Sequence, residues 1–382
     1  MRRVLIYRNH LLPPSETFIV NQAGAMLQHA PIFAGWQRLE KGLGLPADSV
    51  HTFGSGNGLR DKLRRKTYRT LGGAANFARV LAEREAVLAH AHFSLDAAVF
   101  LPIAQKLRIP FVVTLHGYDV TTEDSTLRKS VLGRVYLDRK KQLWENADRF
   151  FCVSEFIRQS AIDRGYPKEK LLTHYIGIDA KAFTPDISIK REPIVLFVGR
   201  LVEKKGCVHL IRAMAQVEAR FPLARLVVIG DGPLRAELEA TAGSLLRRCQ
   251  FLGVQSAQSI KQWLNRSRVF CVPSVIASGG DAEGFGIVFS EAQAMGVPVV
   301  SFATGGIPEA VIHGEGGLLA PERDEKTLAE YISLFLEDDE EWERASRAGR
   351  QWVERAFDLE KQTRLLEQHY FQHAEGADQN PL

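Results

Sequence analysis

Cysteine is scarce in this chain. Its four cysteines, among 382 residues, show no metal-binding spacing, and Cys152 and Cys271 lie inside apolar, strand-like runs. We therefore expect them to pack in the core of a protein from a reducing cytoplasm. Apolar runs are short as well, since none approaches the roughly 18 residues needed to span a bilayer. The segment from Met1 to Arg8 turns polar too early for a secretory leader and predicts a buried strand instead.

Several nucleotide-binding signatures are also missing. No Gly-Lys-Ser/Thr follows Gly199, and neither this turn nor the first turn of the chain has a G-x-G-x-x-G pattern. These absences exclude a P-loop NTPase and argue against a dinucleotide-dependent dehydrogenase. The chain lacks an aromatic-interleaved basic module too, so we expect no nucleic-acid partner.

The net charge of +4 hides an asymmetry between the two halves. Residues 1–190 hold 28 lysines and arginines against 18 acids, whereas the remainder holds 21 against 27. The densest basic segment is 59–69. It predicts either a solvated helical face or a surface that docks on anionic lipid headgroups. We expect a cytoplasmic protein, with peripheral attachment to the inner face of the cytoplasmic membrane as the alternative.

Apolar, β-rich runs alternate with helix-length amphipathic segments, which is typical of parallel α/β sheets. The pattern lapses at 183–193, where Pro185 and Pro193 favour a linker, and then starts again. We therefore predict two doubly wound domains, 1–185 and 190–355, and a helical tail, 356–382, that packs back across the boundary. Strands are predicted at Val4–Tyr7, Pro31–Ala34, Val87–His90, Phe111–Leu115, Phe150–Val153, Ile194–Val198, Leu226–Ile229, Gln250–Leu252, Val269–Val272, Val297–Ser301 and Gly317–Leu319.

The most informative segment runs from Gly280 to Glu291, with the sequence Gly-Asp-Ala-Glu-Gly-Phe-Gly-Ile-Val-Phe-Ser-Glu. Its glycines precede a helix whose first N–H groups are unpaired and favour phosphate. Glu291, in the second turn of that helix, can reach hydroxyls beside the phosphate, and Glu283 stands in the loop on the other side. A ligand with a diphosphate and sugar hydroxyls uses all of these groups, which points to a sugar nucleotide.

Two further turns follow strands of the second half. Gly199-Arg200 and Lys205 can place two cations over a phosphate, with a helix-capping loop and ordinary surface cations as the alternative. Asp231 follows the next strand, where it serves as a turn or N-cap residue or, in a rival interpretation, holds a ribose.

Together these segments resemble the retaining glycosyltransferases of family 4, which have the GT-B fold. The resemblance spans nearly the whole chain and is strongest from Pro193 to Val300. It implies two Rossmann-like domains facing across a cleft, with C-terminal helices crossing back toward the first domain. It rests on Gly199-Arg200 with Lys205-Gly206, on Gly230-Asp231-Gly232-Pro233, on Glu283-Gly284-Phe285-Gly286 with Glu291, and on Thr304-Gly305-Gly306-Ile307-Pro308-Glu309.

The resemblance also implies a donor site. Arg200 and Lys205 bind the diphosphate on this view, and Glu291 holds the ribose hydroxyls. Glu283 faces the donor sugar, and Val254 stands where family members read the base with main-chain groups. The remaining donor-site positions are Gly199 and the Gly284, Phe285, Gly286 and Ile287 backbone.

In the first half, Val113–Asp119 resembles the family's His-Gly-x-Asp turn. His116 then faces the donor sugar and joins Arg200, Lys205 and Glu283 as a catalytic residue, whereas Asp119 braces the turn.

The segment Pro13–Phe18 replaces the Gly-Gly loop of many members. It looks like the Ser-Glu-Thr-Phe element of exopolysaccharide and lipopolysaccharide glycosyltransferases, which favours a polysaccharide acceptor. Ser15, Glu16, Thr17 and His92 are candidates for the acceptor side, with helix capping by Ser15 and a core role for His92 left open.

The activity that the resemblance implies is transfer of a hexose from a UDP-sugar, UDP-glucose or UDP-galactose, to an acceptor hydroxyl with retained anomeric configuration. The acceptor is expected to be a lipid-linked oligosaccharide. Front-face transfer within an ion pair, without a metal or other cofactor, is the expected mechanism. Two alternatives remain, a UDP-sugar 2-epimerase of the same architecture and a non-catalytic sugar-nucleotide-binding subunit.

Overall fold

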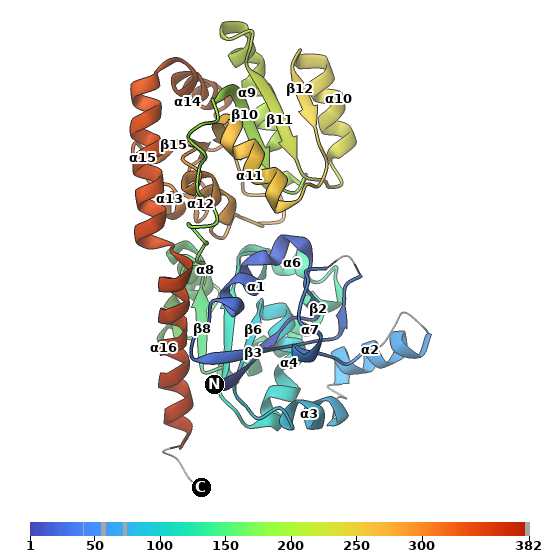
Figure 1. Ribbon diagram of the computed structural model, residues 1–382. Coiled ribbons are helices and arrows are strands. Elements are labelled where there is room, and N and C mark those ends of the chain that lie inside the picture. The colour runs from blue at the N-terminus through green and yellow to red at the C-terminus, as the bar shows by residue number, and fades with distance from the viewer. Residues whose placement is uncertain (41, 55–58, 72–74, 379–382) are drawn as a thin grey trace. The chain divides into compact units, whose positions relative to one another are not determined.

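Two separate parallel sheets organise the chain. The structure is a computed structural model and describes residues 1–40, 42–54, 59–71 and 75–378. It divides into unit 1, residues 1–177 with 359–382, and unit 2, residues 178–358 (Figure 1). The boundary at residues 177–178 comes slightly before the predicted linker, 183–193, and the returning segment starts at 359 rather than at the predicted 356. Each unit is described by itself.

Unit 1 contains a seven-stranded sheet in the order β5-β3-β1-β6-β7-β8-β9, with parallel pairing throughout. Counted from β1, this is the doubly wound order, which reverses direction beside β1. Its elements are β1 (Arg2–Tyr7), β2 (His10–Leu11), η1 (Pro14–Glu16), α1 (Thr17–Gly24), β3 (His29–Gly35), β4 (Gln37–Arg38), η2 (Ala47–Ser49), β5 (Val50–Thr52), α2 (Leu59–Leu71), α3 (Ala75–Ala82), β6 (Ala86–His92), α4 (Ser94–Leu107), β7 (Phe111–Leu115), α5 (Tyr118–Thr121), α6 (Asp124–Leu127), α7 (Val131–Asn146), β8 (Arg149–Cys152), α8 (Glu155–Asp163), η3 (Lys168–Lys170), β9 (Leu171–Thr173) and α16 (Leu359–Asp378).

Unit 2 contains a six-stranded parallel sheet in the order β12-β11-β10-β13-β14-β15, again the doubly wound order. All six strands predicted in the second half are present. The elements are β10 (Glu192–Val198), η4 (Glu203–Lys205), α9 (Cys207–Arg220), β11 (Arg225–Ile229), α10 (Arg235–Leu245), β12 (Cys249–Phe251), α11 (Ala257–Arg266), β13 (Ser267–Cys271), α12 (Ile287–Ala294), β14 (Val299–Phe302), α13 (Ile307–Ala310), β15 (Gly317–Ala320), α14 (Glu325–Glu337) and α15 (Asp339–Ala356).

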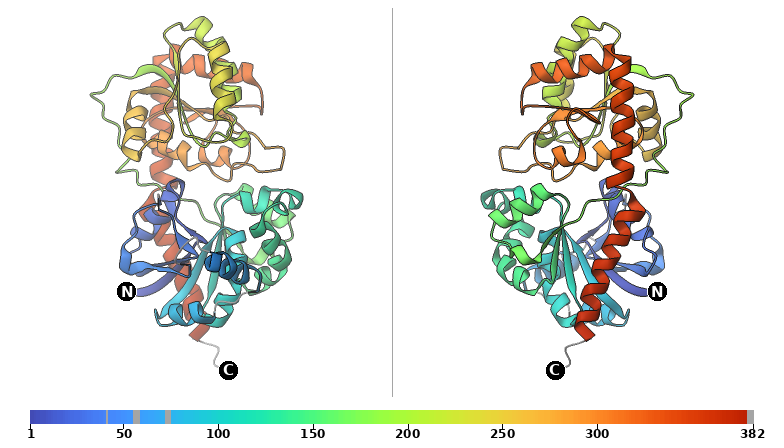
Figure 2. Two further views of the ribbon diagram at one scale, coloured as in Figure 1. Left: turned by 90° about the vertical axis from the view of Figure 1, so that its right-hand side faces the viewer. Right: turned by 90° about the vertical axis from the view of Figure 1, so that its left-hand side faces the viewer.

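The C-terminal helix α16 belongs to unit 1 and lies across its sheet (Figure 2). Leu366 and Tyr370 are fully buried in the same core as Val4 and Leu88. The carboxylate of Glu367 accepts hydrogen bonds from three successive backbone N–H groups, those of residues 27–29, at 2.8–3.1 Å. Apolar burial and these charge-assisted bonds together hold the helix against unit 1.

The acidic run 337–340 lies where α14 ends and α15 begins. The side chain of Asp338 caps α15 by accepting from the N–H of Glu341 at 2.9 Å, and the acids of the first turn suit the positive end of the helix. None of the described helices combines the length and the apolar character that a bilayer span requires.

Candidate functional site

The candidate donor site lies at the carboxyl ends of β10, β11 and β13 in unit 2. Gly230 adopts a φ of +136°, and a Cβ there would lie 1.9 Å from the carbonyl oxygen of Gly199. The turn after β11 therefore packs directly on the turn after β10, and a side chain at Gly230 would separate them. The N–H of Gly199 donates to the carbonyl of Ile229 at 3.0 Å, which joins the two turns again.

Three of the predicted site residues, Arg200, Lys205 and Glu283, lie close together. The ammonium of Lys205 donates to the carboxylate of Glu283, and both side chains are about nine-tenths buried. Burial would raise the pKa of Glu283, but Lys205 first, and then Lys204 and Arg200, lower it to about 2. Arg200 itself is exposed, and its side chain forms no hydrogen bond with the described part of the chain. Its guanidinium is therefore available to an anion.

The helix α12 begins beside this pair. Gly286 has a φ of +79°, and its Cβ position is closed by the ring of Phe289, 2.5 Å away. Phe285 is buried and packs edge-on against Phe357, with ring centroids 4.9 Å apart. The glycine turn and this aromatic anchor start the helix at Ile287, as predicted, so its positive end lies by Glu283.

The predicted Thr-Gly-Gly-Ile-Pro-Glu segment supports the backbone of Glu283. The N–H of Gly306 donates to the Glu283 carbonyl at 2.9 Å, and a Cβ at Gly305 would lie 2.3 Å from the same oxygen. Thr304 donates through its hydroxyl to the carbonyl of Ser274 at 2.7 Å. The segment is therefore a support of the loop that carries Glu283.

Glu291 occupies the second turn of α12, as predicted. It is partly exposed, and its carboxylate forms no hydrogen bond with the described residues. Desolvation raises its pKa to about 7, against a smaller opposing effect of Lys261. A carboxylate with unused acceptor capacity beside a helix N-terminus suits a pair of ligand hydroxyls.

Val254 and Asp231 border the same edge. Val254 is 70% exposed and follows Gly253, whose carbonyl accepts from the N–H of Gly230 at 2.8 Å. Base recognition near Val254 stays a prediction. Asp231 accepts from the N–H of Gly232 at 2.7 Å and pairs with Arg235, so it is a turn residue, and α10 begins after Leu234 without a side-chain cap.

In unit 1, the turn after β7 is held by Asp119. Its fully buried carboxylate accepts from the N–H groups of His116 (3.1 Å), Gly117 (3.0 Å) and Ser94 (2.9 Å). Burial raises the pKa of Asp119, and these hydrogen bonds oppose that shift. The bracing role assigned to Asp119 from sequence matches these contacts.

His116 and His92 meet at the ends of neighbouring strands. The Nδ1 of His92 lies 3.1 Å from the Nε2 of His116, so one ring donates a proton to the other. Burial, together with neighbouring histidines and Arg8, holds the pKa of both well below the usual range. Both imidazoles are therefore neutral at pH 7. His92 is 2% exposed, so it stands behind His116 in the described structure.

The Ser-Glu-Thr element follows a two-residue strand and starts α1 at Thr17. No side chain caps this helix, so the interpretation of Ser15 as its cap is wrong. Glu16 is 8% exposed and accepts two hydrogen bonds from Arg8, at 2.9 and 2.5 Å. Arg8 also donates to the buried Asp96 and lies over the ring of Phe93 at 4.3 Å.

Sequence reasoning missed Arg8 and Asp96 in this cluster. The two acids outweigh the effect of burial and raise the pKa of Arg8 above its usual value. Arg8 stands at the end of a predicted strand, which is a weak signal of a site. Asp96 sits on a helix 88 residues away, and nothing local marks the pairing.

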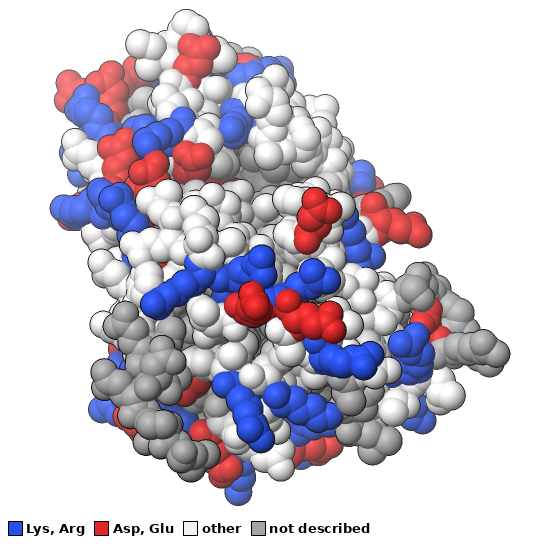
Figure 3. Space-filling view, turned by 60° about the horizontal axis from the view of Figure 1, so that its bottom comes forward, with Lys and Arg blue, Asp and Glu red and all other residues white. Residues whose placement is uncertain are grey.

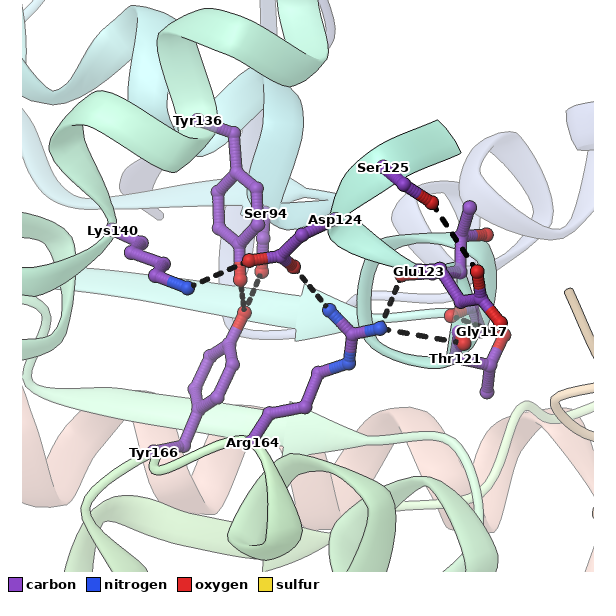
Figure 4. A network of polar contacts seen from close by, with 11 residues as sticks. Ser94, Gly117, Thr121, Glu123, Asp124, Ser125, Tyr136, Lys140, Arg164 and Tyr166 are labelled. Atoms are coloured by element: carbon purple, nitrogen blue, oxygen red, sulfur yellow. Dashed lines mark hydrogen bonds and ion pairs between the residues drawn. The ribbon is translucent and has the colours of Figure 1, made fainter. Parts of the chain in front are cut away.

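A polar network fixes the segment after the His-Gly turn (Figure 4). Arg164 donates to Asp124 at 2.9 Å and to the carbonyl of Thr121, and Lys140 pairs with Asp124 from the other side at 3.2 Å. A second chain of hydroxyls joins Tyr136, Tyr166 and Ser94, with 2.8 Å between successive oxygens. These contacts give the backbone around His116 a rigid support.

Residues 1–40, 42–54, 59–71 and 75–378 contain no group of three histidine, cysteine, aspartate or glutamate side chains placed to hold a metal ion. Metal independence of the chemistry stays a prediction.

Two protein-family models match the chain. "Glycosyltransferase Family 4" matches residues 35–182, and "Glycosyl transferases group 1" matches residues 181–352. The chain is similar to colanic acid biosynthesis glycosyltransferases named WcaL, at 29% identity in both cases. The Escherichia coli protein aligns over 68% of this chain but 64% of its own length, and the Salmonella typhimurium protein over 85% and 88%.

A second group of relatives carries a different donor in its name. A GDP-mannose-dependent mannosyltransferase of Corynebacterium glutamicum is 36% identical over 47% of this chain and 50% of its own length. Among solved structures, Anabaena HepE in complex with UDP and glucose has a TM-score of 0.78 at 19% identity. It covers 97% of this chain and 100% of its own, and at this identity it shows the GT-B fold alone.

Proposed function

Because this chain belongs to glycosyltransferase family 4, we propose that it transfers a hexose from a UDP-sugar to an acceptor hydroxyl with retention of anomeric configuration. The observation that carries the proposal is the convergence of Arg200, Lys205, Glu283 and the first turn of α12 at one sheet edge. Glu291, whose carboxylate has no partner among the described residues, stands one turn further along the helix.

Departure of UDP builds negative charge on the β-phosphate. Arg200, Lys205 and the N–H groups that begin α12 supply fixed positive charge to meet it, without reorganisation during the reaction. Glu283 stays ionised in the ligand-free protein because three cations surround it. Its carboxylate has two acceptor oxygens, so it can stay paired with Lys205 and still accept a hydrogen bond from a sugar hydroxyl.

Front-face transfer is the mechanism that these groups support. A double displacement needs a free carboxylate at the sugar, and the carboxylate of Glu283 is engaged by Lys205. On this proposal UDP leaves and the acceptor oxygen attacks from the same face, and the diphosphate oxygen takes the acceptor proton. No metal takes part, so a chelator leaves the rate unchanged.

The donor is proposed to be UDP-glucose or UDP-galactose. HepE, which shares the fold, has been solved in complex with UDP and glucose, whereas the C. glutamicum relative is named for GDP-mannose. GDP-mannose is therefore the competing donor. Thermal unfolding in the presence of UDP-, GDP- and ADP-sugars separates these possibilities, because the bound nucleotide stabilises the folded state.

The acceptor is proposed to be a lipid-linked oligosaccharide of exopolysaccharide or lipopolysaccharide synthesis. The relatives named for colanic acid biosynthesis support this class of acceptor. Basic side chains are spread over the face shown in Figure 3 with acidic ones among them, so charge alone marks no single patch. On α2, however, Leu63 is 67% exposed beside Lys62 and Arg64, as in a helix that lies on an anionic membrane.

The decisive experiment incubates the protein with each sugar nucleotide and separates the products. Release of UDP, even by slow hydrolysis, supports the transferase. An isomeric UDP-sugar indicates the epimerase instead, and thermal stabilisation without any product indicates a binding subunit. Sedimentation with vesicles containing anionic lipid, compared between the wild type and Leu63→Gln, tests the membrane contact separately.

A further inference from the structure

The 3₁₀ helix η4 faces the loop that carries Glu283, and its three residues each contact a different residue of that loop. The backbone joins the same two segments, since the N–H of Val275 donates to the carbonyl of Lys204 at 2.8 Å. The side-chain contacts are Glu203 to the amide and hydroxyl of Ser278 (both 3.0 Å), Lys204 to Asp281 (2.9 Å) and Lys205 to Glu283.

The two adjacent lysines differ in what they can reach. Lys204 is 8% exposed, and its ammonium lies 2.9 Å from Asp281 Oδ1 and 3.5 Å from the carbonyl oxygen of Ala282. Both partners directly precede Glu283 in the loop. A buried ammonium without a partner is costly, so the loop is held in the place where it satisfies Lys204.

Glu283 is fixed from its other side as well. Its carbonyl accepts from the N–H of Gly306 at 2.9 Å, and Gly305 packs against the same oxygen too closely to allow a side chain. Glu283 thus lies between the Lys204–Asp281 ion pair and the turn at residues 304–306. The helix α12 starts four residues later, so a shift of this segment moves both the carboxylate and the helix N-terminus.

We propose that Lys204 and Asp281 are positioning residues of the donor site, whose ion pair sets the place of Glu283 and of the first turn of α12. This rests on the proposed function of the site. Lys205, and not Lys204, then contacts the diphosphate, and neither Lys204 nor Asp281 touches the donor.

The test compares Lys204→Met and Asp281→Asn with Lys205→Met, and uses Arg212→Met as the control. Arg212 pairs with Glu325 in the same unit at 3.1 Å, and it forms no hydrogen bond or ion pair with residues 275–286 in the described structure. We expect Lys204→Met and Asp281→Asn to lower kcat about 100-fold, because a displacement of about 1 Å costs that much. Their affinity for UDP should fall less than that of Lys205→Met, because Lys205 and Arg200 remain to bind the diphosphate although the first turn of α12 has moved.

Two further measurements separate positioning from stability. Lys204→Arg, and the charge-swapped double variant of Lys204→Asp with Asp281→Lys, should recover most of the lost kcat. Hydrogen exchange of the amides of residues 275–286 should accelerate in Lys204→Met and stay unchanged in Arg212→Met.

Two results overturn the proposal. If Lys204→Met weakens UDP binding as much as Lys205→Met does, Lys204 is a diphosphate ligand. If Lys204→Met has the same kcat and the same amide exchange rates in residues 275–286 as Arg212→Met, the Lys204–Asp281 ion pair does not set the place of Glu283 or of α12. A wild-type protein that turns over no sugar nucleotide contradicts the proposed function instead, and the exchange comparison still tests the hold on the loop.

Discussion

Replacing Glu291 by glutamine is expected to stabilise the ligand-free protein and weaken its binding of nucleotide. The pKa of Glu291 is about 7 in the folded protein, against a usual value of 4.5. Because the folded-state pKa is the higher one, the folded state holds an extra proton between these values, and stability falls as pH rises through this window. The difference corresponds to about 3 kcal/mol above pH 8.

Denaturant unfolding at pH 5 and pH 8 measures this effect. Wild-type protein should lose about 2.5 kcal/mol between the two conditions relative to Glu291→Gln, which cannot ionise. Glu330→Gln is the control, because Glu330 is an exposed glutamate on α14 in the same unit. If Glu291→Gln shows the same pH dependence as wild type, the pKa of Glu291 is not raised in the folded protein and the reasoning is refuted.

The affinity for UDP should respond to pH in the opposite direction, so that it rises as the pH rises. With a pKa of about 7, the ionised fraction of Glu291 rises about tenfold between pH 6 and pH 8. If the carboxylate holds the ribose, the affinity of wild type for UDP rises by the same factor relative to Glu291→Gln. Calorimetry measures the affinity of both proteins for UDP. The ratio of the two affinities cancels the effect of the titration of UDP itself, because that effect is the same for both proteins. An affinity ratio that is independent of pH would refute a role for this carboxylate in binding.

Three further outcomes follow from the same structure. Lys205→Ala should lower turnover by orders of magnitude, while EDTA leaves wild-type turnover unchanged; loss of activity with EDTA and its return with magnesium would exclude the metal-free mechanism. Gly230→Ala should destabilise unit 2 by about 3 kcal/mol in denaturant unfolding, because its φ is +136° and a Cβ meets the Gly199 carbonyl. Burial lowers the pKa of His90 and His174 to about 3, so each should remove about 2 kcal/mol of stability as pH falls from 7 to 5. Denaturant unfolding of wild type and His174→Gln at both pH values measures this, and a variant with the same pH dependence as wild type contradicts it.

Most of the fold could be predicted from the sequence, because most strands appear there as apolar runs. The six strands of unit 2 and the five longer strands of unit 1 all appear as apolar runs. The strands β5 (Val50–Thr52) and β9 (Leu171–Thr173) were missed, although β12 (Cys249–Phe251), which is also a three-residue edge strand, was predicted. The two-residue pair β2 and β4 was missed because two residues are too few to show a period.

The site could be predicted where its residues lie close together in the sequence and form a pattern. Glycines before α12 and acids eight residues apart placed Glu283 and Glu291 on one loop and helix. Lys205 was predicted as a diphosphate ligand, but no role was predicted for Lys204, because its partner Asp281 lies 77 residues away and leaves no local pattern. The pairing of Arg8 with Glu16 and Asp96 depends on strand order, which brings distant segments to one edge of the sheet.

The two glutamates of the motif end in opposite electrostatic environments, although the sequence presents them as a symmetric pair. Three cations hold the pKa of Glu283 down to about 2, whereas Glu291 has Lys261 as its one opposing cation and its pKa rises to about 7. Groups whose environments push their pKa values apart commonly have different tasks. Glu283 is charged at every physiological pH and can anchor the site beside Lys205. Glu291 is poised between its two forms, so the approach of a nucleotide, rather than the fold, decides when it is ionised.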